Sequence, residues 1–268
     1  MPKAYLTIDD SPTAISLNLC RYLKDQNIPA IFYCRGDNIE QHFDDTVEMI
    51  RMGFVIGNHG YAHKRAVGLD YEDVIEDIAR CEDLIDKAYD AAGVKLPGKF
   101  YRFPYLDRGC GAWIVDFDKL PDDIRPIIHD LFADGLYLDD TRPTEALREK
   151  KHMLQYWLAD KGFTLPFEGV TFPWYQHPQM ASALDALYTF STSDWMLTAR
   201  HLEKDHPYKT IEDLKGKIDS DPYLFSDKHN NIVLIHDQVE LEHVFKALVG
   251  HMAASGIEFL PVSSTHQP

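Results

Sequence analysis

The segment AYLTIDD at residues 4–10 decides the fold expectation, because an apolar run ends there in two adjacent carboxylates. Residues 4–8 are long enough and apolar enough to predict a buried β-strand. Asp9 and Asp10 follow this run directly, and apolar residues then recur at helical spacing over residues 15–23. The chain is therefore expected to open with a strand that leads into a helix, with acidic side chains at the junction.

The same strand-to-helix pattern repeats further along the chain. Strands are predicted at residues 30–34, 54–57, 99–103, 232–235 and 259–262. Helices are predicted at residues 15–23, 39–50, 71–89, 145–161 and 239–252, the first of them capped by Asp10 or Ser11. This alternation predicts an α/β fold with a parallel sheet, either open or closed into a (β/α) barrel.

The middle of the chain, at about residues 107–190, is less regular than the rest. It contains a helix-like stretch and aromatic-rich turns, but no repeat, low-complexity tract or linker sets it apart. We interpret it as a long insertion within a single domain that spans residues 1–268.

The composition excludes several classes of protein. The 268 residues are 45% hydrophobic and 26% charged, which is typical of a folded globular chain. With 27 basic and 43 acidic residues the net charge is −16, which argues against a general nucleic-acid surface and against an anionic membrane surface. A neutral or cationic substrate is favoured.

The cysteines and the N-terminus bear on the compartment. Four widely spaced cysteines without a C-x-x-C pair predict reduced thiols and no disulfide scaffold. The first residues contain no apolar signal segment, and no apolar run is long enough for a transmembrane segment. We therefore expect a cytoplasmic protein, or a secreted one if a leader precedes this sequence.

Polar side chains gather where the predicted strands end. Asp9 and Asp10 follow the first strand, His59 the third, Tyr105 the fourth, and His236 the strand at 232–235. In a (β/α) barrel the carboxyl ends of the strands meet at one rim, which is where active sites lie. Four coincidences of this kind indicate a functional site more strongly than any single residue does.

Each signal alone has an ordinary explanation. An acidic pair after a strand is usually a helix cap, and 13 histidines make one His-x3-His pair unremarkable by chance. Taken together, however, two imidazoles and one carboxylate are a usual ligand set for a catalytic divalent metal. A spare carboxylate and a lone histidine beside them would complete the groups needed for metal-assisted acyl hydrolysis.

Five short motifs, in order along the chain, carry a resemblance to a known family. They are Thr7-Ile8-Asp9-Asp10-Ser11-Pro12, Asn58-His59-Gly60-Tyr61-Ala62-His63, Arg102-Phe103-Pro104-Tyr105, Asp194-Trp195 and Leu234-Ile235-His236. They resemble, in order, the Thr-Phe-Asp-Asp-Gly-Pro, His-Ser/Thr-x-x-His, Arg-x-Pro-Tyr, Asp-x-x-Asp-Trp and Leu-x-His motifs of the polysaccharide deacetylases, which are carbohydrate esterase family 4 with the NodB-homology domain. The resemblance covers most of residues 3–106 and about 186–262, and it implies a distorted (β/α) barrel with the insertion between the third and fourth motifs.

The resemblance also implies a metal centre. Asp10, His59 and His63 would hold a divalent ion, with Zn²⁺ favoured by the ligand set and Co²⁺, Ni²⁺ or Mn²⁺ as alternatives. Asp9 would act as the base for the attacking water, and Arg102 would orient Asp9. The implied reaction is hydrolysis of the N-acetyl group of an amino sugar in a chitin-like or peptidoglycan-like carbohydrate, with release of acetate.

The remaining motif residues would bind the substrate and complete catalysis. The backbone N–H of Tyr105 would stabilise the oxyanion, because Pro104 has no N–H to offer. His236 would protonate the departing amine and Asp194 would fix its tautomer. Trp195 and Leu234 would form an apolar wall for the acetyl methyl group, beside Tyr105.

Three departures from the family pattern bear on these expectations. Ile8 and Ser11 replace Phe and Gly, which is tolerable if the turn does not demand a positive φ at Ser11. Gly60 replaces the hydroxyl residue that helps to hold the metal loop, which puts the rigidity of that loop in question. Arg102 and Asp194 are 92 positions apart, which is longer than usual for the family.

Other functions remain open on the sequence alone. The same groups could remove formyl or acetyl from a lipid-linked or nucleotide-linked amino sugar inside the cell. A catalytically inactive carbohydrate-binding protein would need a broken ligand triad, whereas Asp10, His59 and His63 are all present. A purely structural barrel would require five ordered motifs to be accidental.

Overall fold

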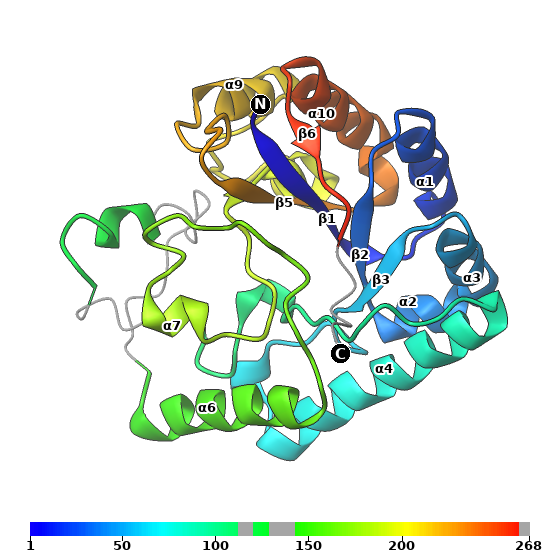
Figure 1. Ribbon diagram of the computed structural model, residues 1–268, viewed down its shortest axis with the longest axis vertical. Helices are drawn as coiled ribbons and strands as arrows, with labels where there is room; N and C mark the ends of the chain where they lie inside the picture. Colours follow the sequence, from blue (N-terminus) through cyan, green and yellow to red (C-terminus); the bar gives the residue numbers. More distant parts are fainter. Residues whose placement is uncertain (112–119, 129–142, 263–268) are drawn as a thin grey trace.

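The sheet is built from short parallel strands with the first strand at its centre (Figure 1). The computed structural model describes residues 1–111, 120–128 and 143–262. Its strands are β1 (Lys3–Ser11), β2 (Ala30–Cys34), β3 (Val55–Asn58), β4 (Phe190–Ser191), β5 (Asn230–His236) and β6 (Glu258–Phe259). They lie in the order β3-β2-β1-β5-β4, and β6 pairs with the start of β1.

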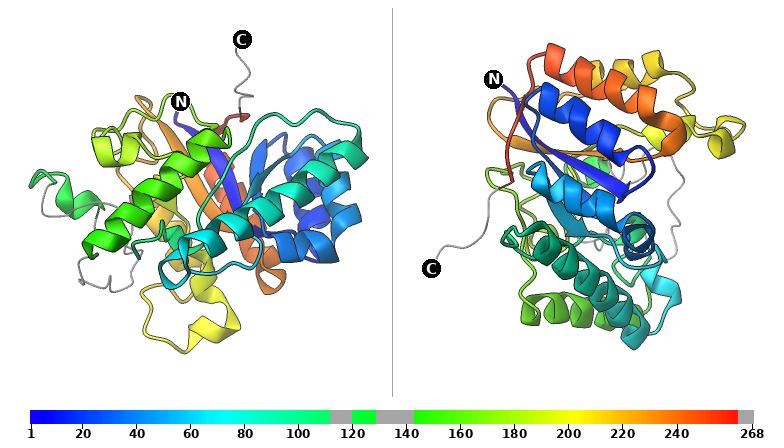
Figure 2. Two further views of the ribbon diagram at one scale, coloured as in Figure 1. Left: turned by 90° about the horizontal axis from the view of Figure 1, so that it is seen from below. Right: turned by 90° about the vertical axis from the view of Figure 1, so that its right-hand side faces the viewer.

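Helices cover one face of this sheet. The helices that pack there are α1 (Ser16–Asp25), α2 (Gly36–Gln41), α3 (Phe43–Arg51), α4 (Tyr71–Ala92), α9 (Ile211–Ser220) and α10 (Glu242–Ala254). In the right-hand view of Figure 2, α10, α1, α3 and α4 form a continuous layer. Leu6, Ile8 and Phe32 point into the main apolar core under this layer.

The opposite face of the sheet carries the alternate residues of the same strands. Because side chains alternate along a strand, Thr7 and Asp9 lie on the other face from Leu6 and Ile8. Tyr5, Ile232 and Leu234 on this inner face pack against aromatic side chains from residues 167–188. The inner face is therefore covered by the middle of the chain instead of by the helical layer.

The sheet continues beyond β3 through isolated bridges. Asn58 pairs in parallel with Tyr101, and Tyr101 pairs in parallel with Asp185, which lies five residues before β4. These bridges run from one edge strand towards the other, in keeping with a distorted barrel. The predicted α/β fold with a parallel sheet is thus confirmed.

Some element boundaries predicted from the sequence were wrong. The strand expected at 99–103 is reduced to single bridges, because Lys99 pairs with Phe163 while Tyr101 pairs with Asn58 and Asp185, so no ladder can extend. The helix expected at 39–50 is two helices, α2 and α3, which meet at the non-helical His42. The last strand, β6, spans only Glu258–Phe259 where residues 259–262 were expected, and β4 was not expected.

The predicted cap of the first helix was also wrong. The helix begins after Ile15, which makes no side-chain cap bond. Asp10 and Ser11 instead belong to the end of β1. A strand that extends to Ser11 leaves these two side chains at the rim of the sheet, where they contact other elements.

The middle of the chain contributes α6 (Glu145–Asp160) and α7 (Pro178–Ala181). Thr144 caps α6 by accepting a hydrogen bond from the N–H of Leu147, and α6 packs beside α4 (Figures 1 and 2). The reading of about 107–190 as an insertion in one domain stays a prediction, and part of that range lies outside the described residues. Short helices complete the chain: η1 (Ala66–Gly68), η2 (Pro104–Leu106), η4 (Asp194–Leu197), α8 (Ala199–Leu202) and η5 (Val239–Leu241).

Two sequence expectations concern the whole chain. All four cysteines are buried and none forms a disulfide, as predicted. Over the described ranges, no helix combines the length and the apolar character required to cross a bilayer.

Candidate active site

Three predicted metal ligands meet at the carboxyl ends of β1 and β3. Asp10 stands near the end of β1, and His59 and His63 lie on the loop that follows β3. One ligand atom from each of these three residues lies within 4.8 Å of the others. Parallel pairing of β1, β2 and β3 brings these distant parts of the sequence to one edge of the sheet.

The hydrogen bonding of His59 leaves one ring nitrogen free to bind a metal ion. Its Nδ1 lies 2.7 Å from the backbone oxygen of Arg102, which can only accept, so Nδ1 carries the proton. Its Nε2 then faces Asp9 Oδ2 at 3.7 Å and Asp10 Oδ1 at 3.9 Å. Burial lowers the pKa of His59 to about 4, which keeps the imidazole neutral.

Asp10 presents an unsatisfied oxygen to the two histidines. Its Oδ1 lies 3.1 Å from His63 Nε2, yet this buried oxygen makes no hydrogen bond. Burial opposes ionisation of Asp10, but the neighbouring His63, His236 and His59 hold the pKa of the carboxyl far below its usual range. An ionised carboxylate oxygen that faces two imidazoles fits the donor set of a divalent cation.

Several site residues adopt a backbone conformation that L-amino acids rarely use. The φ angles are +68° at Asp10, +51° at His63 and +57° at Tyr105. Such conformations cost of order 1–3 kcal/mol each and concentrate at functional sites. The positive φ falls on Asp10 and not on Ser11, so replacement of glycine by Ser11 brings no strain, as expected.

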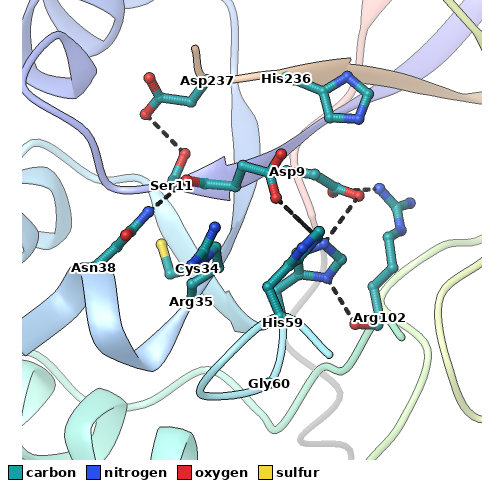
Figure 3. A network of polar contacts seen from close by, with 12 residues as sticks. Asp9, Ser11, Cys34, Arg35, Asn38, His59, Gly60, Arg102, His236 and Asp237 are labelled. Atoms are coloured by element: carbon teal, nitrogen blue, oxygen red, sulfur yellow. Dashed lines mark hydrogen bonds and ion pairs between the residues drawn. The ribbon is translucent and has the colours of Figure 1, made fainter. Parts of the chain in front are cut away.

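Asp9 is fixed by a buried ion pair (Figure 3). Arg102 Nη1 lies 2.8 Å from Asp9 Oδ1 and 2.8 Å from the Thr7 hydroxyl, and Arg102 is fully buried. Arg102 Nε also donates to the backbone oxygen of Ala186. These bonds occupy one oxygen of Asp9 and leave Oδ2 directed towards His59 and the ligand group.

His236, the last residue of β5, is held by Asp194. Its Nδ1 lies 2.9 Å from Asp194 Oδ1, and its backbone N–H donates to Asp194 Oδ2. Asp9 and His236 are register partners of the adjacent strands β1 and β5, which places His236 beside the ligand group. Burial alone lowers the pKa of His236, but Asp194, Asp10 and Asp9 outweigh it and raise the pKa to about 9.

The pair of His236 and Asp194 should make the free energy of unfolding depend on pH. Because the folded pKa of His236 is about 9 and its ordinary value is 6.5, the stabilisation is complete below pH 6.5 and is lost as pH rises through 9. We expect Asp194→Asn to lower the free energy of unfolding most at pH 6 and least at pH 9.5, measured by urea denaturation of the metal-free chain. Asp219→Asn, at the exposed pair with His251, is the matched control. An equal loss at both pH values would contradict this.

The three predicted substrate-binding residues differ in exposure and in the side chains that they contact. Tyr105 is 51% exposed, and its ring packs against His63, with the Arg65 guanidinium 4.3 Å from the ring centre. Leu234 lies two residues before His236 and so shares its face of β5, but it is largely buried. Trp195 follows Asp194 and packs against two histidine rings, those of His201 and His206.

Some residues at the site were not expected from the sequence. Thr7 belongs to the first motif, but no role was expected for it. Its hydroxyl accepts from Arg102, and its position two residues before Asp9, on the same face of β1, is the signal that could have identified this role. Asp237 accepts from the hydroxyls of Ser11, Thr13 and Ser16, which ties the end of β5 to the turn after β1. No local pattern in the sequence links residue 237 to residues 11–16.

Comparisons with known proteins bear on the family resemblance and on the fold. The family model described as polysaccharide deacetylase matches residues 1–113. A peptidoglycan-N-acetylglucosamine deacetylase of Bacillus cereus is 29% identical over 101 residues, which are 37% of this chain and 35% of the relative. A chitin deacetylase of Colletotrichum lindemuthianum is 32% identical over 112 residues, which are 39% of this chain and 43% of the relative. The matches thus span less than half of these curated relatives.

The fold extends further than the sequence similarity. A family 4 carbohydrate esterase from Streptomyces lividans, solved in complex with acetate, matches over 99% of this chain and 95% of its own, at 14% identity and a TM-score of 0.56. The family model confirms the resemblance over residues 1–113, which hold the first three motifs, and the solved structure confirms the fold class that the resemblance implied.

Proposed function

We propose that this chain, whose first 113 residues match the polysaccharide deacetylase family, hydrolyses the N-acetyl group of an amino sugar with the help of a divalent metal ion. The observation that carries the proposal is the convergence of three groups at one rim of the sheet. These groups are the ligand set Asp10, His59 and His63, the pair Asp9–Arg102, and the pair His236–Asp194.

The ligand set is suited to Zn²⁺. A carboxylate and two imidazoles leave coordination positions for water and substrate, and Co²⁺, Ni²⁺ or Mn²⁺ could take the same place. The unbonded Oδ1 of Asp10 and the unprotonated Nε2 of His59 supply the electron pairs for this. A bound divalent cation would polarise the acyl carbonyl and make water beside it more acidic.

Asp9 acts as the general base in this proposal. Its Oδ2 accepts the proton of the attacking water, while Oδ1 stays bonded to Arg102. Because Arg102 is also held by Thr7 and Ala186, the carboxylate cannot rotate away from the site. A fixed base of this kind contributes through both proton transfer and orientation.

The family motifs also assign residues to the oxyanion and to the acetyl group. The backbone N–H of Tyr105 stabilises the oxyanion in this proposal. Leu234 and Trp195 contact the methyl group in this proposal. These three roles follow the family motifs and stay part of the proposal.

His236 acts as the general acid for the departing amine. Its Nδ1–H is engaged with Asp194, so the proton for the amine comes from Nε2. Asp194 raises the pKa of His236 and so favours the protonated imidazole that the step needs. An amine leaves poorly as an anion, and a charged imidazole beside it therefore lowers the barrier.

The names of the relatives support a carbohydrate substrate. One relative is a peptidoglycan-N-acetylglucosamine deacetylase and another a chitin deacetylase. We propose an N-acetylated oligo- or polysaccharide as the substrate of this chain, with the cytoplasmic location still a prediction. The net charge of −16 accords with a neutral polymer better than with an anionic one.

Acetate release tests the proposal directly. We expect the zinc-loaded protein to release acetate from N-acetylglucosamine oligomers, and excess EDTA to abolish the release by removing the ion from Asp10, His59 and His63. Added Zn²⁺ in excess of the chelator should restore it. Full activity in excess EDTA would contradict the metal-dependent reaction, and activity only on nucleotide-linked amino sugars would overturn the proposed substrate.

A further inference from the structure

We propose that Asp77, on helix α4, is the positioning residue that fixes the loop carrying His59 and His63 in its metal-binding conformation. The inference rests on the proposed function only in taking these histidines as ligands. Asp77 does not belong to the five motifs, and it lies 14 positions after His63 in the sequence.

The loop between the two histidines has few internal contacts and is held from outside. The N–H of His59 donates to the backbone oxygen of Cys34 at 2.9 Å, and the N–H of Gly60 donates to Asn58 Oδ1 at 2.9 Å. The loop also accepts hydrogen bonds from the start of α2. The N–H groups of Gly36 and Asp37 donate to the backbone oxygens of Gly60 and Tyr61, respectively, at 3.0 Å each. These bonds fix the first half of the loop.

Asp77 fixes the second half. Its Oδ2 accepts the N–H of Tyr61 at 2.7 Å, and its Oδ1 accepts the N–H of Ala62 at 3.0 Å. Both oxygens of one carboxylate are thus used by two successive backbone amides, the second of them next to His63. Bonds from amides to a charged acceptor are among the strongest in proteins, so the approach of His63 to Asp10 depends on this side chain.

Gly60 gives an independent sign of this dependence. Its φ is +73°, and a Cβ built at this position would lie 2.6 Å from Asp77 Oδ2. A side chain at residue 60 and the Asp77 carboxylate therefore exclude each other. The sequence put the rigidity of this loop in question because Gly60 replaces a hydroxyl residue. The missing side chain instead leaves room for the Asp77 carboxylate, which holds the loop.

Zinc affinity is the measurement that tests Asp77. We expect Asp77→Ala to weaken Zn²⁺ binding to the metal-free chain about 10- to 100-fold by calorimetric titration, as is typical when a residue that supports metal ligands is removed. Asp77→Asn keeps one acceptor oxygen, so its Zn²⁺ affinity should lie between those of the parent and of Asp77→Ala. Asp73→Ala removes an exposed carboxylate one turn earlier on α4 and should bind Zn²⁺ as the parent does.

A double-mutant cycle separates positioning from general destabilisation. Gly60→Ala in the parent should displace the carboxylate and weaken Zn²⁺ binding, whereas in the Asp77→Ala background it should add much less. The backbone strain of a non-glycine residue at φ +73° is common to both backgrounds and cancels in the cycle. Additive losses would mean that the two residues act separately, which would overturn the proposal.

The Co²⁺ form supplies a spectroscopic readout. Its visible absorption should change in Asp77→Ala and stay as in the parent in Asp73→Ala, because only the first variant moves His63. Parent-like Zn²⁺ affinity and spectra in a folded Asp77→Ala variant would overturn the inference. A parent chain that binds Zn²⁺ but releases no acetate would contradict the proposed function alone, since neither measurement uses a substrate.

Discussion

Asp9→Asn is expected to slow acetate release from N-acetylglucosamine oligomers by about 10²- to 10⁴-fold, the usual contribution of a general base. The amide that replaces the carboxylate can still accept a hydrogen bond from Arg102, but it cannot take a proton from water. Because Asp9 is not one of the three proposed ligands, the zinc content should stay close to one ion per chain. The measurement is kcat with zinc content determined on the same samples.

The control for Asp9→Asn is Asp44, which is also the first residue of an Asp-Asp pair, Asp44-Asp45. Asp44→Asn changes an exposed carboxylate at the start of α3, outside all five motifs. It should leave both rate and zinc content unchanged. Arg102 keeps its bonds to Thr7 and to the backbone of Ala186 in Asp9→Asn, so a folded protein is expected. Loss of zinc with loss of rate would recast Asp9 as a ligand.

His236→Ala is expected to lower turnover by about 10²- to 10⁴-fold while zinc content stays unchanged. The proton that the departing amine needs comes from this imidazole, whose charged form is favoured by its bond to Asp194. Asp194 retains two of its bonds in the variant, from the backbone N–H of residue 236 and from the Thr192 hydroxyl. The fold should therefore tolerate the change.

The leaving group distinguishes acid catalysis from a structural effect. An acetyl ester whose leaving group departs readily as an anion, such as p-nitrophenyl acetate, needs no proton donor. His236→Ala should therefore lose little activity on this ester and much on the amide. An equal loss on both substrates would contradict the assignment of His236 as the acid, and a loss of zinc would make it a ligand.

The sequence by itself determined the building units and the residues that could carry chemistry. The apolar run before Asp9 and the alternation that follows are local patterns, and local periodicity is what decides between strand and helix. His59 and His63 could be paired in advance because they are only four positions apart in the sequence. Tyr101 shows the limit, because its pairing with Asn58 and Asp185 replaced the expected strand by single bridges.

Only the tertiary structure decided which of these residues meet. Parallel pairing inserted β5 between β1 and β4, and this made Asp9 a neighbour of His236, 227 positions away. The packing of α4 placed Asp77 against the loop of His59 and His63. The fold also buried Arg102 against Asp9. The physical reason is that sheet order, register and burial arise from contacts between distant segments, which a short stretch of sequence does not encode.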